Sequence, residues 1–256
     1  MDSASKHNPI FIPRATIFNA PVRVNLDADA WVDAWQLPPE KVPSKLFSRL
    51  WDARPRTATH LFSVNHNFRR RYETQRLTRS FGVLPPFTRS IGSYMFAECD
   101  AELETAMAAP AATLHCPMPS EIQQLSHVFA GEDHEAGNQA TVNWYSCGKD
   151  WLPFHSDLTD GGTSDILSVT LAPRDAPPRN FVIKHKSKRN KPDAAVVIET
   201  CNGTVIVMGG SMQSRYVHGL PPADDYCEPR INVSFRTYAT VKSNVLNDSA
   251  MDAPAE

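Results

Sequence analysis

The chain has 256 residues, of which 41% are hydrophobic and 21% charged, and its formal net charge is -2 at pH 7. This composition suits a globular chain with a sizeable core, and no apolar run approaches the roughly 20 residues that a membrane-spanning helix needs. The start of the chain lacks the apolar stretch of a secretory signal, and its five cysteines form no Cys-x-x-Cys pair. We therefore expect an intracellular protein of the nucleus or cytoplasm with reduced thiols and no membrane partner.

Helical signals occur in the first half of the chain. Residues 1–40 contain scattered prolines without periodicity, so we expect an extension that wraps over the core or is partly mobile. Apolar residues at helical spacing over 46–51 predict a short amphipathic helix. A second helix is predicted from Ser120, a suitable N-cap, to Ala130, because Gly131 would end it. Both apolar stripes are typical of packing against a core.

After residue 136 the apolar period changes from that of a helix to that of a strand. The predicted strands are 139–147, 166–171, 181–185, 194–200, 204–208 and 231–238. No helical pattern lies between them, which indicates a sandwich or barrel rather than βαβ units. The small, polar residues that follow, from 241 to 256, predict a flexible tail.

The nearly neutral net charge conceals an uneven distribution. Residues 54–79 and 174–191 together contain fourteen basic and two acidic residues, so the rest of the chain is acidic overall. Taken alone, each basic block is as typical of a solvated surface as of a binding site. Net charge therefore does not exclude a nucleic acid as partner.

One histidine among nine is followed by an acid two residues later, in His155-Ser156-Asp157. In an extended segment this spacing directs both side chains to the same side, as a 2-His-1-carboxylate iron site requires. His218, in a distant segment, would be the third ligand. The simpler interpretations are a surface histidine beside a turn aspartate and an ordinary loop or core histidine.

A strictly alternating segment follows from Arg230 to Arg236. One face would carry Arg230, Asn232, Ser234 and Arg236, and the other Ile231, Val233 and Phe235. Such a polar face can be solvent-exposed, but two arginines that frame small polar residues also suit a carboxylate. Asn143 and Tyr145 share one face of an upstream strand in the same way.

Together these segments resemble the AlkB family of Fe(II)- and 2-oxoglutarate-dependent oxygenases, particularly the branch that repairs alkylated bases. The resemblance extends over residues 75–238. It is most specific at Arg-Ile-Asn-Val-Ser-Phe-Arg-Thr (230–237), where the branch has Arg-x-Asn-(Leu/Val)-Thr-Phe-Arg. Similar matches are Asn-x-Tyr-x-x-Gly at 143–148, the Arg-x-Phe strand from Arg179, Gly203-Thr204, and His-x-x-Pro from His218.

The resemblance implies a mainly β fold with flanking helices, built on a double-stranded β-helix (jelly-roll) core of the 2-oxoglutarate oxygenases. That core would occupy residues 136–240. Residues 51–135 would form a nucleotide-recognition lid and a supporting helix, and residues 1–50 an N-terminal extension with the first helix. We expect the chain to be a monomer.

The resemblance also assigns roles to residues. Fe(II), the catalytic metal, would be bound by His155, Asp157 and His218. The cosubstrate 2-oxoglutarate would be bound by Asn143, Tyr145, Arg230, Asn232, Ser234 and Arg236, with Arg230 on the distal carboxylate, and dioxygen would take the last open metal position. The nucleic acid would contact Phe81, Arg79, Lys186, Lys188 and Arg189. Phe81 would stack on a flipped base, although an ordinary core aromatic is an equal alternative.

The implied activity is oxidative demethylation of N-alkylated bases, such as 1-methyladenine and 3-methylcytosine, in DNA or RNA. Its products would be formaldehyde, succinate and CO2. A 2-oxoglutarate oxygenase acting on a protein or a small molecule would share the same metal and cosubstrate residues, but its activity would not depend on the basic blocks. A binding module without catalysis would form no succinate.

Overall fold

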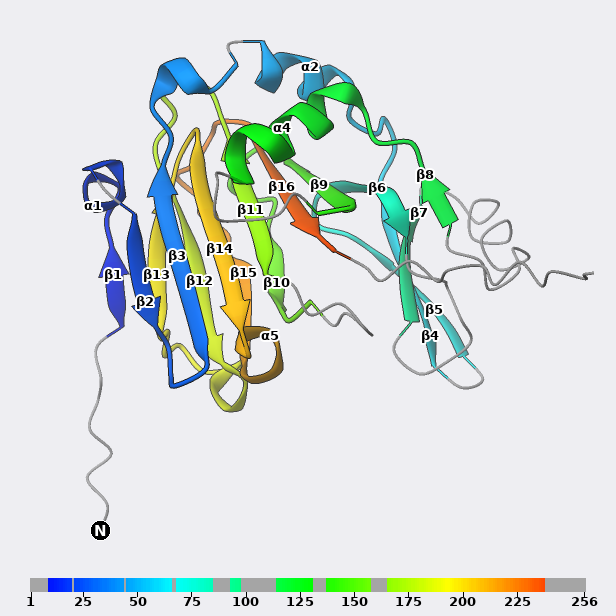
Figure 1. Ribbon diagram of the computed structural model, residues 1–256. Coiled ribbons are helices and arrows are strands. Elements are labelled where there is room, and N and C mark those ends of the chain that lie inside the picture. The colour runs from blue at the N-terminus through cyan, green and yellow to red at the C-terminus, as the bar shows by residue number, and fades with distance from the viewer. Residues whose placement is uncertain are drawn as a thin grey trace, which may run out of the picture.

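The computed structural model describes residues 9–19, 21–43, 45–65, 68–84, 93–97, 114–130, 137–157 and 165–237. Its core consists of two packed β-sheets (Figure 1). The five-stranded sheet contains, in spatial order, β1 (Ile10–Ile12), β13 (Val196–Thr200), β12 (Arg179–His185), β15 (Tyr216–Leu220) and β10 (Leu152–His155). The predicted mainly β fold with flanking helices is confirmed.

The second sheet has eight strands. In spatial order they are β2 (Val22–Asn25), β3 (Ala30–Gln36), β14 (Thr204–Gly210), β11 (Ile166–Leu171), β16 (Arg230–Arg236), β9 (Gln139–Tyr145), β6 (Leu77–Leu84) and β8 (Leu114–Cys116). All six predicted strands are present, and their ends differ from the prediction by no more than two residues. The strands β10 and β15 were not predicted, although they carry His155 and His218.

The described part of residues 1–40 differs from expectation, because it contributes strands to both sheets. β1 pairs in parallel with β13, and β3 pairs along its whole length with β14. Between them lie α1 (Arg14–Asn19) and β2, and η1 (Pro39–Lys41) follows β3. The strands of both sheets therefore begin well before residue 136, and the domain boundaries given above stay a prediction.

Both predicted helices are present and cover the eight-stranded sheet. α2 (Leu46–Asp52) and α4 (Ser120–Ala130) lie over its outer face (Figure 1). There Leu50 and Leu125 join an apolar cluster with Ile231, Val233 and Phe235 of β16. No helix in the described ranges is long and apolar enough to cross a membrane.

Residues of the expected lid form a smaller sheet beside the sandwich. It consists of β4 (His60–Asn65), paired on one side with β5 (Phe68–Glu73) and on the other with β7 (Ser93–Ala97). Figure 1 shows these strands beyond β6, at the edge of the eight-stranded sheet.

The space between the two large sheets is divided into an apolar and a polar half. Around β3, β14, β12 and β13 it is filled by aliphatic side chains such as Val32, Ile183 and Ile206. Around β11, β16 and β9, the side chains that alternate with the outer cluster are polar, for example Ser168 and Asn232. Because every residue of β16 is buried, its arginines do not form a solvated face.

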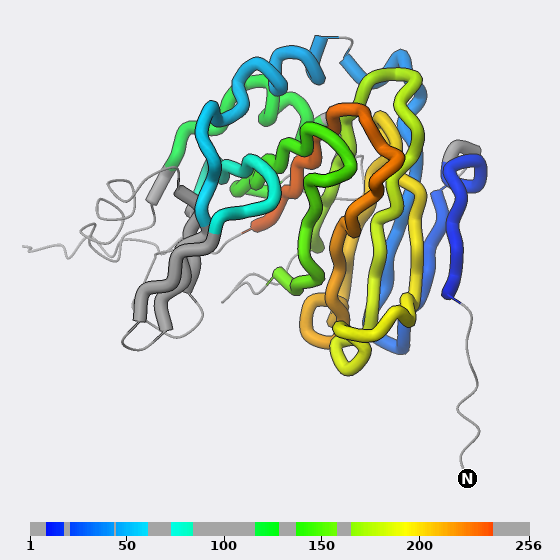
Figure 2. Tube along the Cα trace, turned by 180° about the vertical axis from the view of Figure 1, so that it is seen from behind, coloured from blue at the N-terminus to red at the C-terminus, as the bar shows by residue number. Residues whose placement is uncertain are grey.

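Two short helices lie at one end of the sandwich. η2 (Lys186–Lys188) follows β12, and α5 (Met212–Arg215) joins β14 to β15. Figure 2 shows both connections side by side at the same end. Because β10 ends at His155, which lies opposite His218 of β15, this is also the end at which the two histidines meet.

Candidate metal centre

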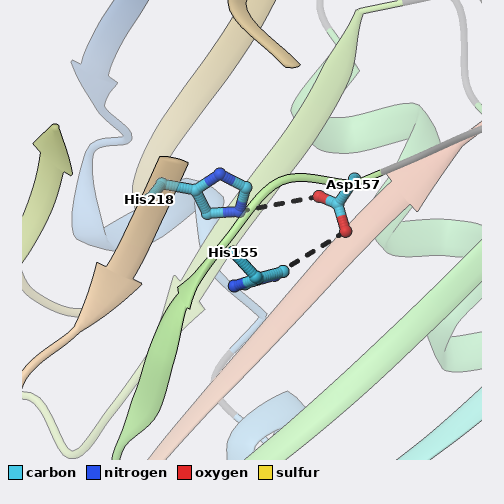
Figure 3. A group of neighbouring side chains, drawn as sticks. All are labelled: His155, Asp157 and His218. Carbon is cyan, nitrogen blue, oxygen red and sulfur yellow. Dashed lines mark ion pairs between the residues drawn. The ribbon is translucent and has the colours of Figure 1, made fainter. Parts of the chain in front are cut away.

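Three side chains that were predicted to bind a metal converge between the sheets. His155 lies opposite His218 in the pairing of β10 with β15, and Asp157 follows two residues later. Each offers one ligand atom, and these atoms lie within 4.8 Å of one another. Figure 3 shows the carboxylate of Asp157 facing both imidazoles. Two imidazoles and one carboxylate on one side of a site suit non-haem Fe(II) and leave other positions open.

The two imidazoles are held with their Nε2 atoms toward the carboxylate. Nδ1 of His155 lies 2.9 Å from the carbonyl oxygen of Pro153, which favours the tautomer with its proton on Nδ1. Nε2 then lies 3.7 Å from Asp157 Oδ1. His218 is buried against the ring of Phe181, and its Nε2 lies 3.6 Å from Asp157 Oδ2.

The carboxylate of Asp157 is held by an arginine on one side and open on the other. Arg236 donates a 2.8 Å hydrogen bond from Nη2 to Oδ1, while Oδ2 is buried and has no hydrogen-bond partner among the described residues. An unsatisfied buried oxygen beside Nε2 of His218 fits a site for a cation, because an unpaired acceptor is costly inside a protein.

The protonation states at the site suit metal binding. Burial lowers the pKa of His218 to about 3, and burial also lowers the pKa of His155. Burial alone would raise the pKa of Asp157, but the guanidinium of Arg236 and the imidazoles lower it to well below its ordinary value. Near pH 7 the site thus presents two neutral imidazoles and one carboxylate, the forms that bind a metal.

The predicted polar face of β16 continues from this centre into the interior, with an arginine at each end. Arg230, at the far end, is 2% exposed, and its NH2 donates to the hydroxyl oxygen of Thr170 at 2.8 Å. Its Nε has no hydrogen-bond partner, and no carboxylate in the described ranges forms an ion pair with it. Burial lowers the pKa of Arg230 to about 10, so the group remains a cation at neutral pH.

Tyr145 lies beside this cation. The Arg230 guanidinium carbon is 5.3 Å from the centre of the Tyr145 ring, and the buried Tyr145 hydroxyl has no hydrogen-bond partner in the described part of the chain. A buried guanidinium next to an unsatisfied phenol is a site for an anionic group. A carboxylate there would accept two hydrogen bonds from the guanidinium and one from the phenol.

Asn232 and Ser234 lie between the two arginines, but they bond mainly to the sheet. The amide nitrogen of Asn232 donates to Ser168 Oγ at 2.8 Å and to the Val169 carbonyl oxygen at 3.1 Å. Ser234 Oγ donates to Asn232 Oδ1 at 3.1 Å. The two bonds of Asn232 tie β16 to β11, while the bond of Ser234 lies within β16 and holds the Asn232 amide.

Arg76 is a further residue of the site, although the sequence placed it only within a basic block and gave it no role. It is buried, and its Nε donates a 2.6 Å hydrogen bond to Oδ1 of Asn143. Because this bond occupies the amide oxygen, it fixes which way the Asn143 amide points. No local pattern marks Arg76, since its partner lies 67 residues away in the chain.

Arg179 closes the far end of the polar space. Its NH2 donates to the carbonyl oxygens of Asp150 at 3.0 Å and Pro221 at 2.9 Å, which joins two loops. The same loops interlock at Gly148, where a Cβ would lie 1.7 Å from the Ala223 carbonyl oxygen. The far end is thus closed by main chain.

Two predicted substrate residues on β6 face away from the metal centre. Phe81 lies opposite Ala140, and Arg79 opposite Val142, and both partners belong to the outer apolar cluster. Residues directly opposite each other share a face of the sheet. Phe81 packs against that cluster, which agrees with the alternative of an ordinary core aromatic. The expected contacts of Phe81 and Arg79 with a nucleic acid stay predictions.

The basic turn after β12 lies near the metal end. Ile183 of β12 is opposite His218, so Lys186 lies about 10 Å further along the strand direction. Lys188 and Arg189 are exposed in this turn. Lys184 anchors the turn, because its buried ammonium lies 2.5 Å from the Lys191 carbonyl oxygen and 4.2 Å from the centre of the Phe154 ring.

Comparisons with known proteins agree with this arrangement. The family model of the 2OG-Fe(II) oxygenase superfamily matches residues 93–236. The chain is 26% identical over 129 residues to the DNA oxidative demethylase ALKBH2 of Homo sapiens, covering 47% of each chain. It is 28% identical over 123 residues to ALKBH2 of Bos taurus, covering 44% of this chain and 42% of that protein. The chain thus spans less than half the length of these curated relatives.

A solved structure is also similar, the crystal structure of an oxidoreductase of the 2OG-Fe(II) oxygenase family from Burkholderia pseudomallei. The similarity covers 81% of this chain and 87% of that chain, with 12% identity and a TM-score of 0.40.

Proposed function

Because this chain belongs to the 2OG-Fe(II) oxygenase superfamily, we propose that it is an AlkB-like oxidative demethylase of N-alkylated bases in DNA or RNA. The family uses Fe(II), 2-oxoglutarate and dioxygen. In this proposal His155, Asp157 and His218 hold the iron. The convergence of these three side chains, with Oδ2 of Asp157 unsatisfied, is the observation that carries the proposal.

Bound iron supplies the oxidising chemistry, in which 2-oxoglutarate and dioxygen yield succinate and CO2 while the substrate is hydroxylated. The side chains of this protein bind and orient. Arg236 keeps the carboxylate of Asp157 ionised, and the Pro153 carbonyl oxygen keeps Nε2 of His155 free to bind the metal. An N-methyl group that is hydroxylated in this way loses formaldehyde, and the base is restored.

Arg230 binds the distal carboxylate of 2-oxoglutarate in this proposal, and the Tyr145 hydroxyl donates to the same group. The support is that both groups are buried with hydrogen-bonding capacity unused, whereas Arg236 at the other end of β16 already has a carboxylate partner. Asn143, oriented by Arg76, completes the pocket. Asn232, held by the hydroxyl of Ser234, keeps β16 in register with β11, and the expected contact of both residues with 2-oxoglutarate stays a prediction.

Nucleic acid is the proposed substrate class because a basic turn lies at the metal end of the sandwich. Lys186 lies about 10 Å beyond the His218 register, and Lys188 and Arg189 follow it in the turn that Lys184 anchors, which suits contact with phosphates beside a base at the metal. The printed function of the two curated relatives, DNA oxidative demethylation, favours the same class.

Turnover on defined oligonucleotides tests the reaction. The purified chain, Fe(II) and 2-oxoglutarate are incubated with strands that carry 1-methyladenine or 3-methylcytosine, and the products are identified by mass spectrometry. We expect loss of the methyl group with formaldehyde and succinate, and no turnover by His155→Ala. Retained turnover by His155→Ala would contradict the metal assignment. Succinate formation only with a peptide or small molecule would contradict the substrate class.

Salt-dependent binding tests the basic turn separately. The triple variant Lys188→Ala, Arg189→Ala, Lys191→Ala should bind a methylated oligonucleotide more weakly at low salt, with a shallower dependence of affinity on salt, because each phosphate contact releases counterions. Arg174→Ala, an exposed basic residue outside the turn, is the matched control. An unchanged slope in the triple variant would contradict a role of the turn in binding nucleic acid.

A further inference from the structure

The backbone at Asp157 lies outside the regular hydrogen bonding of the sheet. β10 ends at His155, and Asp157 stands two residues beyond it. Its main-chain N–H donates instead to a side chain, the Oε1 atom of Gln213, at 2.9 Å. Asp157, the proposed metal ligand beyond the end of β10, is thus held at its main chain by a residue 56 positions later in the sequence.

Gln213 sits on α5, a single helical turn that is itself held on both sides. The Ser211 N–H donates to the Asp29 carbonyl oxygen at 2.8 Å, next to the start of the helix. At its end Arg215 forms ion pairs with Asp27 at 3.1 Å and with Asp29 at 2.9 Å. The turn between β2 and β3 therefore fixes α5 against the sandwich.

The same helix leads directly into the strand that carries the second histidine. β15 begins at Tyr216, immediately after Arg215, and His218 is its third residue. The amide nitrogen of Gln213 lies 3.7 Å from Sδ of Met208 in β14, so the amide spans from that strand to Asp157. One side chain thus couples the backbone of Asp157 to the element that positions His218.

We infer that Gln213 is a positioning residue for the metal, which fixes the backbone of Asp157 so that its carboxylate faces both imidazoles. This inference rests on the proposed iron site. Arg236 holds one carboxylate oxygen of Asp157, whereas Gln213 holds the main chain of the same residue. Both contacts restrict the orientation of the carboxylate, and prior orientation of ligands raises metal affinity.

Variants of Gln213 separate the hydrogen bond from simple packing. Gln213→Met removes the acceptor at nearly constant length, and Gln213→Ala removes the whole side chain as a second loss variant. Gln213→Glu keeps an acceptor oxygen. Ser214→Ala, at the exposed neighbouring position on α5, is the matched control. Each full-length variant is titrated with Mn(II), an analogue of Fe(II) that is stable in air, by isothermal calorimetry, and its melting temperature is measured with chelator.

Gln213→Met and Gln213→Ala should bind Mn(II) about tenfold more weakly, the lower end of the range for residues that orient metal ligands. Gln213→Glu and Ser214→Ala should bind as tightly as the unsubstituted chain, and the melting temperatures with chelator should agree. Unchanged affinity in both loss variants, or an equal loss in Gln213→Glu, would overturn the inference.

A failure of the metal site itself gives a different result. His155→Ala lacks one proposed ligand and should lose Mn(II) binding altogether. If the unsubstituted chain binds no more tightly than His155→Ala, then the proposed site is wrong and the role of Gln213 falls with it. If the unsubstituted chain binds and both loss variants bind equally well, only the role of Gln213 is wrong.

Discussion

The two ends of β16 place the same side chain in opposite situations. At the metal end, Arg236 is 2.8 Å from the carboxylate of Asp157 and also donates to Thr141 at 3.1 Å. At the far end, Arg230 is more deeply buried, yet its hydrogen bonds in the described ranges go to the hydroxyls of Thr170 and Thr200 rather than to a carboxylate. One charge is balanced within the fold and the other is not.

This difference separates what the fold needs from what a ligand needs. A buried ion pair is costly to break, because the remaining partner is left charged without water. A buried cation without an acid is already costly, so its removal relieves the fold while it removes a binding group. The comparison therefore predicts opposite effects on stability for the same substitution at the two ends.

Arg236→Met should have the largest effect on folding. It leaves the carboxylate of Asp157, 13% exposed, without its guanidinium partner. We expect a loss of about 3 kcal/mol in the free energy of unfolding, measured by urea denaturation with chelator present. The exposed pair of Arg215 with Asp29 provides the control, because Arg215→Met should lower the free energy of unfolding far less. An equal loss of unfolding free energy in Arg236→Met and Arg215→Met would contradict the view that the buried pair of Arg236 with Asp157 stabilises the fold.

Arg76→Met should have an intermediate effect, on cosubstrate binding. Without the bond from Arg76 the Asn143 amide is free to turn, and we expect 2-oxoglutarate to bind about tenfold more weakly, the loss of one charge-assisted hydrogen bond. Calorimetry on the Mn(II)-loaded chain measures this. Arg79→Met, on the outer face of β6, which begins directly after Arg76, should bind normally. An equal loss of 2-oxoglutarate affinity in Arg76→Met and Arg79→Met would contradict the role of Arg76 in orienting Asn143.

Arg230→Met should have the smallest effect on folding, and of the opposite sign to that of Arg236→Met. Without ligand, the variant should be as stable as the unsubstituted chain or more stable by about 1 kcal/mol, because a buried unpaired cation is removed. Urea denaturation under the conditions used for Arg236→Met provides the comparison. A loss as large as that of Arg236→Met would mean that Arg230 serves the fold rather than a ligand.

The sequence predicted those parts of the molecule in which the pattern is local. The alternation in β16 predicted its two faces correctly, since Ile231 and Val233 lie in the outer cluster and the polar residues face inward. The spacing of His155 and Asp157 predicted their convergence, because this pattern is local in the sequence as well. By contrast, β3 was missed because its buried positions include the small residues Ala30 and Ala34, which give a weak apolar signal.

Contacts between distant segments could not be predicted from the pattern. Arg76 and Gln213 act on partners 67 and 56 residues away, and nothing near them in the sequence marks those partners. The side of the eight-stranded sheet on which Phe81 lies depends on the register of β6 with β9. A shift of this register by one residue would move Phe81 to the other side.

The most direct test of the account compares two cosubstrates that differ only at the far end of the pocket. 2-Oxopentanoate has the same carbon chain as 2-oxoglutarate but lacks the distal carboxylate, and binding of each to the Mn(II)-loaded chain is measured by calorimetry. The unsubstituted chain should prefer 2-oxoglutarate by about a hundredfold, and Arg230→Met should lose this preference by weakening 2-oxoglutarate alone. If Arg230→Met keeps the preference, Arg230 does not bind the distal carboxylate, and the central claim is wrong.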